Sequence, residues 1–123
     1  MLSSMMPYER FEAWRLCHQL TLEVYRRTKT FPAEERYGLV TQARRAAFSA
    51  AANIAEGSAK RGHREFRRFL DISIGSLAEL SYAIRLSAEL GYLSESDAAE
   101  LGMLRERASQ VTWRLYQSLG RRS

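Results

Sequence analysis

The sequence has little of several features that would complicate its fold. Its one cysteine, Cys17, cannot form an intramolecular disulfide, so we expect a reducing compartment. Its two prolines, Pro7 and Pro32, lie outside the periodic segments and leave room for long helices. The longest nearly apolar stretch, residues 46–55, is too short to span a bilayer, and the N-terminus lacks the pattern of a signal peptide. We therefore expect a cytoplasmic protein without membrane contact.

Motifs of familiar catalytic and metal sites are also missing. Glu-x-x-His, His-Glu-x-x-His and Cys-x-x-Cys do not occur, so we expect no metal and no cofactor. The stretch from Gly57 to Gly62 lacks the Lys-Ser/Thr pair and the preceding strand of a P-loop. His18 lies on an apolar stripe and is expected in the core, whereas His63 is expected to cap a helix or contact a phosphate. These absences argue against an enzyme.

Hydrophobic periodicity predicts four helices in a single domain of 123 residues. The expected helices span residues 8–29, 38–59, 63–90 and 95–119. The first carries an apolar stripe of Phe11, Trp14, His18, Thr21 and Tyr25, with Cys17, Leu20 and Val24 beside it. The second presents mainly alanine, so its neighbours must approach closely. Short connections between amphipathic helices predict an all-α, antiparallel up-and-down four-helix bundle.

Positive charge is concentrated at one expected end of this bundle. The chain has 19 Lys and Arg against 14 Asp and Glu, a net charge of +5. The joint between the second and third helices lies at the same end as the start of the first and the finish of the fourth. That end carries Lys60, Arg61, Arg64, Arg67 and Arg68, joined by Arg10, Arg121 and Arg122. Such a focused cluster favours phosphate, and therefore RNA or DNA.

The opposite end is expected to be mainly acidic. It carries Glu34, Glu35, Glu89, Glu95, Asp97 and Glu100, which Arg26, Arg27, Lys29 and Arg36 offset in part. We therefore predict a polarised molecule. Secondary candidates for nucleic-acid binding are Arg44, Arg121 and Arg122.

A polar stripe borders the alanine face of the second helix and continues on the third. Its members are Gln42, Arg45, Asn53, Glu56 and Glu79, with Ser49 and Ser76 between them. An antiparallel pairing places Arg45 near Glu79 and Ser76, and Glu56 near Arg68. One interpretation is a set of half-buried ion pairs that fix helix register. The other is that some of these side chains line a groove or channel in an assembly.

Several apolar side chains are expected to face away from the core. They are Trp113 and Tyr116 on the fourth helix and Tyr82 and Leu86 on the third, with Gly75 leaving bare backbone nearby. Single exposed aromatic residues are common, but several on adjacent faces indicate a self-association surface.

The chain resembles the four-helix proteins encoded within intervening sequences of large-subunit ribosomal RNA genes. The resemblance rests on Phe11-x-x-Trp14, Phe31-Pro32, Glu35-x-Tyr37-Gly38-Leu39-x-x-Gln42, Arg44-Arg45-Ala46-Ala47, Asn53-Ile54-Ala55-Glu56-Gly57, Glu65-Phe66-x-x-Phe69-Leu70, Gly75-Ser76-Leu77-x-Glu79-Leu80 and Leu90-Gly91-Tyr92-Leu93. It implies a helical bundle that assembles into a ring, expected to be a homopentamer. It also implies relatedness to accessory proteins of diversity-generating retroelements, which pair with a reverse transcriptase and bind nucleic acid. Ala50-Ala51 stands where the family usually has proline, so we expect a straighter second helix.

Two hypotheses about function follow. The first is a non-enzymatic, ring-forming protein that binds RNA or DNA through phosphate contacts of the basic end. The second is an oligomeric scaffold whose partner is another protein, such as a reverse transcriptase, with no direct nucleic-acid contact.

Overall fold

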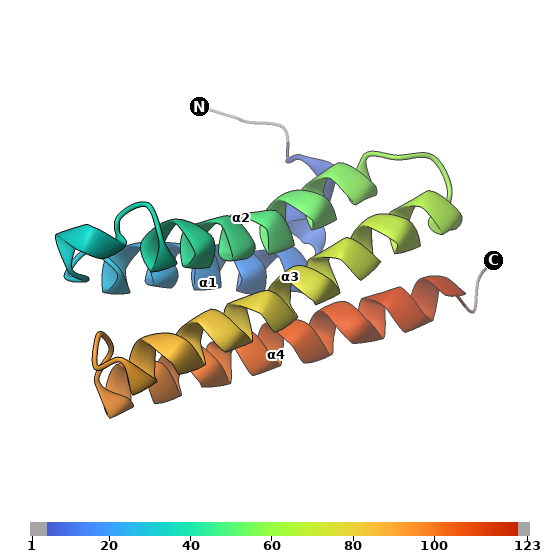
Figure 1. Cartoon of the computed structure of the whole chain (residues 1–123). Coiled ribbons are helices and arrows are strands. Elements are labelled where there is room, and N and C mark those ends of the chain that lie inside the picture. The colour runs from blue at the N-terminus through green and yellow to red at the C-terminus, as the bar shows by residue number, and fades with distance from the viewer. Residues whose placement is uncertain (1–4, 121–123) are drawn as a thin grey trace.

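The computed structural model describes residues 5–120, and every regular element within them is a helix. Four long helices follow one another along the chain: α1 (Glu12–Arg27), α2 (Leu39–Ser58), α3 (His63–Glu89) and α4 (Glu95–Gly120). Two short 3₁₀ helices, η1 (Pro7–Arg10) and η2 (Ala33–Glu35), precede α1 and α2. The prediction of an all-α four-helix bundle is confirmed (Figure 1).

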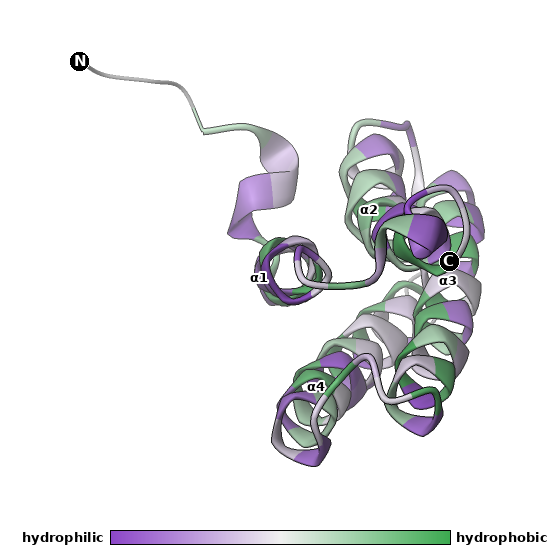
Figure 2. Cartoon of the chain, turned by 60° about the vertical axis from the view of Figure 1, so that its left-hand side comes forward, coloured by the Kyte–Doolittle hydropathy of each residue, from purple (hydrophilic) through white to green (hydrophobic). Residues whose placement is uncertain are grey.

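Each long helix packs against two neighbours, so the bundle is square in section. Contacts join α1 to α2, α2 to α3, α3 to α4 and α4 back to α1. The pair α1–α2 therefore lies opposite the pair α3–α4, as Figure 1 shows. The α2–α3 connection, η1 and the last turn of α4 meet at one end, where they line a common cavity. This is the arrangement that the basic cluster requires. Hydrophobic and hydrophilic residues alternate around the helices (Figure 2).

Small side chains bring α2 and α3 close together. The alanines of α2 that face the core are buried, and α2 runs unbroken through Ala50 and Ala51. The Ser73 hydroxyl donates a hydrogen bond of 2.8 Å to the carbonyl oxygen of Ala50. Near the end of α2 the approach is closer still, because a Cβ added at Gly57 would lie 2.7 Å from the Cβ of Phe69. Only glycine fits there without displacing α3.

The first helix was predicted to begin at residue 8, but α1 begins at Glu12. Residues 7–10 form the separate 3₁₀ helix η1, which begins at Pro7. The Glu9 carboxylate accepts a hydrogen bond of 2.7 Å from the backbone N–H of Met6, just before η1. Phe11 then adopts an extended conformation, with φ −88° and ψ 127°. Its ring packs on Phe66 with the centroids 5.3 Å apart. The extended residue thus fastens the N-terminal segment to α3.

The close contact at Gly57 makes a prediction about stability. Gly57→Ala should lower the free energy of unfolding by about 1–3 kcal/mol, because the new methyl group overlaps Phe69 Cβ and Phe66. Gly102→Ala is the matched control, since a Cβ at this helical glycine meets nothing within 4 Å. It should raise stability by about 0.5–1 kcal/mol. Urea unfolding at one protein concentration measures both, and a Gly57→Ala variant as stable as wild type contradicts the packing.

Candidate nucleic-acid interface at the α2–α3 end

The basic end is built around the short connection between α2 and α3. Gly62 is the N-cap of α3, with a φ of +83°, a conformation that favours glycine. Because glycine has no side chain to cap the helix, the first backbone N–H groups of α3 remain open to a ligand. Lys60 and Arg61 precede this turn, and Arg64 and Arg68 follow it within two turns of helix.

Two of the predicted cations have carboxylate partners three or four residues away in the sequence. Lys60 Nζ lies 4.0 Å from Glu56, and Arg68 Nε lies 3.3 Å from Glu65. All four side chains are substantially exposed, so these pairs contribute little to stability and leave the cations accessible. Lys60 and Arg68 also lie over the ring of Phe69, at 5.5 Å and 4.6 Å from its centroid. The ring holds both cations without neutralising them.

Three more arginines supply charge without a counterion among residues 5–120. Arg10, Arg61 and Arg64 are exposed there and form no ion pair, and His63 beside them is half-buried. A cavity of about 450 Å³ lies between η1, the α2–α3 connection and the end of α4. Arg10, Lys60 and His63 contribute to its lining. The structure therefore brings a cation of η1 and a cation of the α2–α3 connection to one concave surface.

Arg67 differs from its neighbours because it is engaged inside the protein. Its guanidinium lies 4.1 Å from the centroid of the Tyr116 ring, and its Nε donates to the Tyr116 carbonyl oxygen at 3.3 Å. The side chain is half-buried and joins α3 to the last turns of α4. It therefore acts in packing.

The secondary candidates are not at this end, so far as the structure describes them. Arg44 lies in the first half of α2, toward the opposite pole, where its Nε donates to the Thr28 hydroxyl at 2.9 Å. Arg121 and Arg122 lie outside the described residues.

The polar stripe does not form the predicted interhelical ion pairs within residues 5–120. Gln42, Arg45, Glu56 and Glu79 are exposed, and of these Glu56 alone forms an ion pair there, with Lys60 of its own chain segment. Asn53 is half-buried and donates to the Ser49 carbonyl and hydroxyl oxygens, at 2.8 Å and 3.1 Å. The Ser49 hydroxyl in turn lies 2.8 Å from that of Ser76 on α3. Two neutral hydroxyl groups connect the helices at this stripe, and the Asn53 amide binds one of them from within α2.

Several carboxylates at the opposite pole have partners within the protein. Arg27 forms ion pairs of 2.8 Å with both Asp97 and Glu100, which raise the pKa of the guanidinium. The Glu35 carboxylate accepts hydrogen bonds of 3.1 Å from the Leu39 N–H and from the Tyr92 hydroxyl. Several carboxylates that the sequence places at this pole are thus already engaged.

A comparison with family models covers most of the chain. The model described as 23S rRNA-intervening sequence protein matches residues 9–114. The chain belongs to this family. The resemblance seen in the sequence is thereby confirmed.

A solved structure of the S23 ribosomal protein family has the same fold. It is a protein of unknown function from Bacteroides thetaiotaomicron, and the superposition has a TM-score of 0.76. The match covers 85% of this chain and 97% of that one, at 14% sequence identity. None of the curated proteins matches the chain.

This family member exposes apolar side chains on two opposite faces. On the α3–α4 side, Tyr82 and Trp113 are 65% and 48% exposed. Tyr116 and Leu86, also predicted at an interface, are half-buried, and Tyr116 stacks against Trp113 at 5.4 Å between centroids.

The second exposed face was not predicted, because His18 was expected in the core and no pattern singled out Phe48. His18 is exposed, not buried, and stacks on Trp14 at 4.8 Å with the rings nearly parallel. Together with Leu22, Tyr25 and Phe48 they line a mainly apolar groove between α1 and α2, of about 570 Å³. Phe48 is 62% exposed beside it. The core face of α1 is instead made by Ala13, Leu16, Cys17, Leu20 and Val24.

The single cysteine of the chain lies in the core. Cys17 is fully buried, and burial raises the pKa of its thiol to about 12, so the thiolate is scarce at neutral pH. Within residues 5–120, no three His, Cys, Asp or Glu side chains are grouped to hold a metal ion. None of the helices described there is long and apolar enough to cross a bilayer.

The two arginine environments on α3 predict different effects of truncation. Arg67→Ala should lower the free energy of unfolding by about 1–2 kcal/mol, because it removes the packing on Tyr116. Arg64→Ala removes an exposed side chain and should change stability by less than about 0.5 kcal/mol. Urea unfolding of both variants measures the difference, and equal effects contradict the structural role of Arg67.

Proposed function

We propose that this protein binds structured RNA or DNA through phosphate contacts of its basic end, and that it does so without catalysis. The observation that carries the proposal is a cavity lined by Arg10, Lys60 and His63, next to the exposed Arg61 and Arg64, which form no ion pair among residues 5–120. Lys60 and Arg68 add two accessible cations. The uncapped start of α3 supports the same ligand class, since helix N-termini favour phosphate.

Phosphate contacts of this kind position a nucleic acid without reading its bases. Arg and Lys neutralise the backbone and release its counterions, so affinity falls with salt. Among residues 5–120 the basic end shows no row of exposed aromatic rings on which bases would stack, since Phe11 and Phe66 pack on each other and Phe69 is buried. We therefore infer recognition of shape and charge.

The salt dependence of binding tests this proposal. Arg61→Ala/Arg64→Ala should weaken binding to an RNA hairpin and reduce the slope of log affinity against log salt by about 1.5. Arg26→Ala/Arg85→Ala is the control, because both arginines are exposed and lie toward the opposite end. This double variant removes the same number of positive charges. Fluorescence anisotropy at several salt concentrations measures the slopes. Equal slopes for the two double variants contradict binding at the basic end.

We also propose that copies of the chain assemble into a ring, with five subunits expected from the family resemblance. The support is the pair of apolar surfaces on opposite sides of the bundle: the α1–α2 groove with Phe48, and the α3–α4 face with Trp113 and Tyr82. Two different faces that fit each other make a head-to-tail contact, which closes into a ring when the rotation allows. A ring would repeat the basic end around one rim and add weak phosphate contacts by multivalency.

Mixing two single variants tests this head-to-tail contact. Phe48→Glu and Trp113→Glu should each lower the mass measured by light scattering, because each removes one of the two faces. When mixed, they should form a one-to-one dimer through the two faces that remain intact. A contact between identical faces would give no such dimer and contradicts the proposal.

The scaffold hypothesis has support from the same groove. If Phe48→Glu leaves the mass unchanged, the α1–α2 groove is free for a different protein, such as the reverse transcriptase that the resemblance suggests. In that case RNA binding that is insensitive to Arg61→Ala/Arg64→Ala would favour a scaffold without nucleic-acid contact.

A further inference from the structure

A second cationic site lies at the opposite pole, where the sequence predicts mainly acidic character. The connection from α1 to α2 encloses a pocket of about 340 Å³, and Lys29, Arg36 and Arg44 contribute to its lining. None of these three forms an ion pair with a carboxylate of residues 5–120. The nearby acidic residues Asp97 and Glu100 are paired with Arg27. The lining of the pocket thus holds three basic side chains and no carboxylate, and Glu35, next to Arg36 in the sequence, is hydrogen-bonded to Leu39 and Tyr92.

Arg44 is held in position for a ligand. Its Nε donates to the Thr28 hydroxyl at 2.9 Å, and one Nη donates to the Tyr25 carbonyl oxygen at 3.3 Å. The guanidinium also lies 4.6 Å from the centroid of the Tyr25 ring. The Thr28 hydroxyl is fixed in turn, because it donates to the Val24 carbonyl oxygen at 2.8 Å. A guanidinium has five N–H donors, so three remain for an anion.

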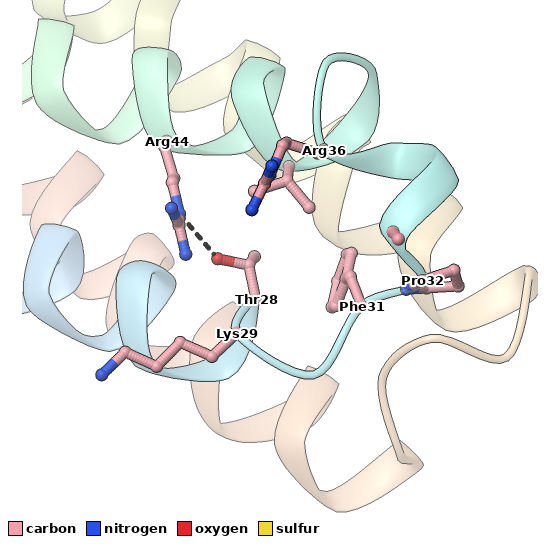
Figure 3. Close-up of a pocket in the computed structure, with 8 residues that line it drawn as sticks. Thr28, Lys29, Phe31, Pro32, Arg36 and Arg44 are labelled. Atoms are coloured by element: carbon pink, nitrogen blue, oxygen red, sulfur yellow. Dashed lines mark hydrogen bonds between the residues drawn. The ribbon is translucent and has the colours of Figure 1, made fainter.

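The cations stand beside an apolar wall. Phe31 and Val40 are each 8% exposed and line the same pocket, together with Pro32. Figure 3 shows Arg36 and Arg44 extending toward Thr28 and Phe31, while the ammonium of Lys29 extends away from Phe31. The pocket thus combines two converging guanidinium groups, a third positive charge at its rim and a hydrophobic surface. Pockets of this size and mixed character typically bind small molecules.

We propose that this pocket binds a small organic phosphate monoester. Arg36 and Arg44 would hold the phosphate, because two guanidinium groups from different parts of the chain can each contact separate oxygens of a tetrahedral dianion. Lys29 adds charge at the rim, and the organic group lies against Phe31 and Val40. A carboxylate offers one charge and a planar group, which matches this arrangement less well. The site is independent of the nucleic-acid proposal, since it lies at the other end of helices about 30–40 Å long.

Calorimetric titration of the full chain with phenyl phosphate tests the site. Phenyl phosphate should bind more tightly than inorganic phosphate, because the ring contacts the apolar wall. Phenol and benzoate should bind at least tenfold more weakly than phenyl phosphate. Arg36→Gln should weaken phenyl phosphate binding about tenfold or more, because it removes a charge-assisted contact from an exposed side chain. Arg44→Gln should weaken it at least as much.

Two controls separate this site from other positive surfaces. Arg26→Gln changes an exposed arginine at the same pole that does not line the pocket, and it should leave the affinity unchanged. Arg61→Ala/Arg64→Ala should also bind phenyl phosphate as wild type does, whatever its effect on RNA. Backbone amide NMR shifts should cluster at residues 28–44. No binding at millimolar phenyl phosphate, an unchanged affinity in Arg36→Gln, or shifts confined to residues 58–68 would each overturn the proposal.

Discussion

The close approach of α2 and α3 at Gly57 is the constraint on which the basic end depends. With no side chain at this position, the Cβ of Phe69 and the ring of Phe66 can lie against the backbone of α2. The two helices then stay in contact up to the turn at residues 59–62, and α3 starts immediately beyond it. A wider separation would need a longer connection. Arg10, Lys60 and His63 would then no longer line one cavity.

Aromatic rings hold three cations at this end, two of which also have an exposed carboxylate partner. Lys60 and Arg68 lie over Phe69, and Arg67 lies over Tyr116. The ring faces attract cations while keeping their net charge, whereas buried carboxylates would cancel it. The Phe69 and Tyr116 rings also belong to the packing between helices. Contacts between cations and rings therefore contribute to both packing and surface charge. Arg67 packs on Tyr116, whereas Arg61 and Arg64 are exposed and can contact a ligand.

The sequence predicted the bundle because three of its signals agree. Helical periodicity, the alanine face of α2 and the two prolines outside the helices all indicate the observed architecture. The grouping of basic residues at one end followed from the up-and-down order of the four helices alone. The α1 stripe from Trp14 to Tyr25 was wrongly assigned to the core, because amphipathic rings at helical spacing occur equally at the edge of a groove. The polar stripe was paired about one turn out of register: Ser76 was expected beside Arg45 and lies against Ser49. Such a shift depends on side-chain packing, which spacing does not encode.

The two ends of the bundle use positive charge in different ways. One end spreads cations over a broad surface, and the other holds Arg36 and Arg44 beside an apolar wall. The most direct measurement of the central claim is a map of backbone amide NMR shifts during titration with a short RNA hairpin. The account predicts that the largest shifts fall at residues 7–10 and 58–68. Shifts spread evenly over the helices, or confined to the α1–α2 groove, would contradict it.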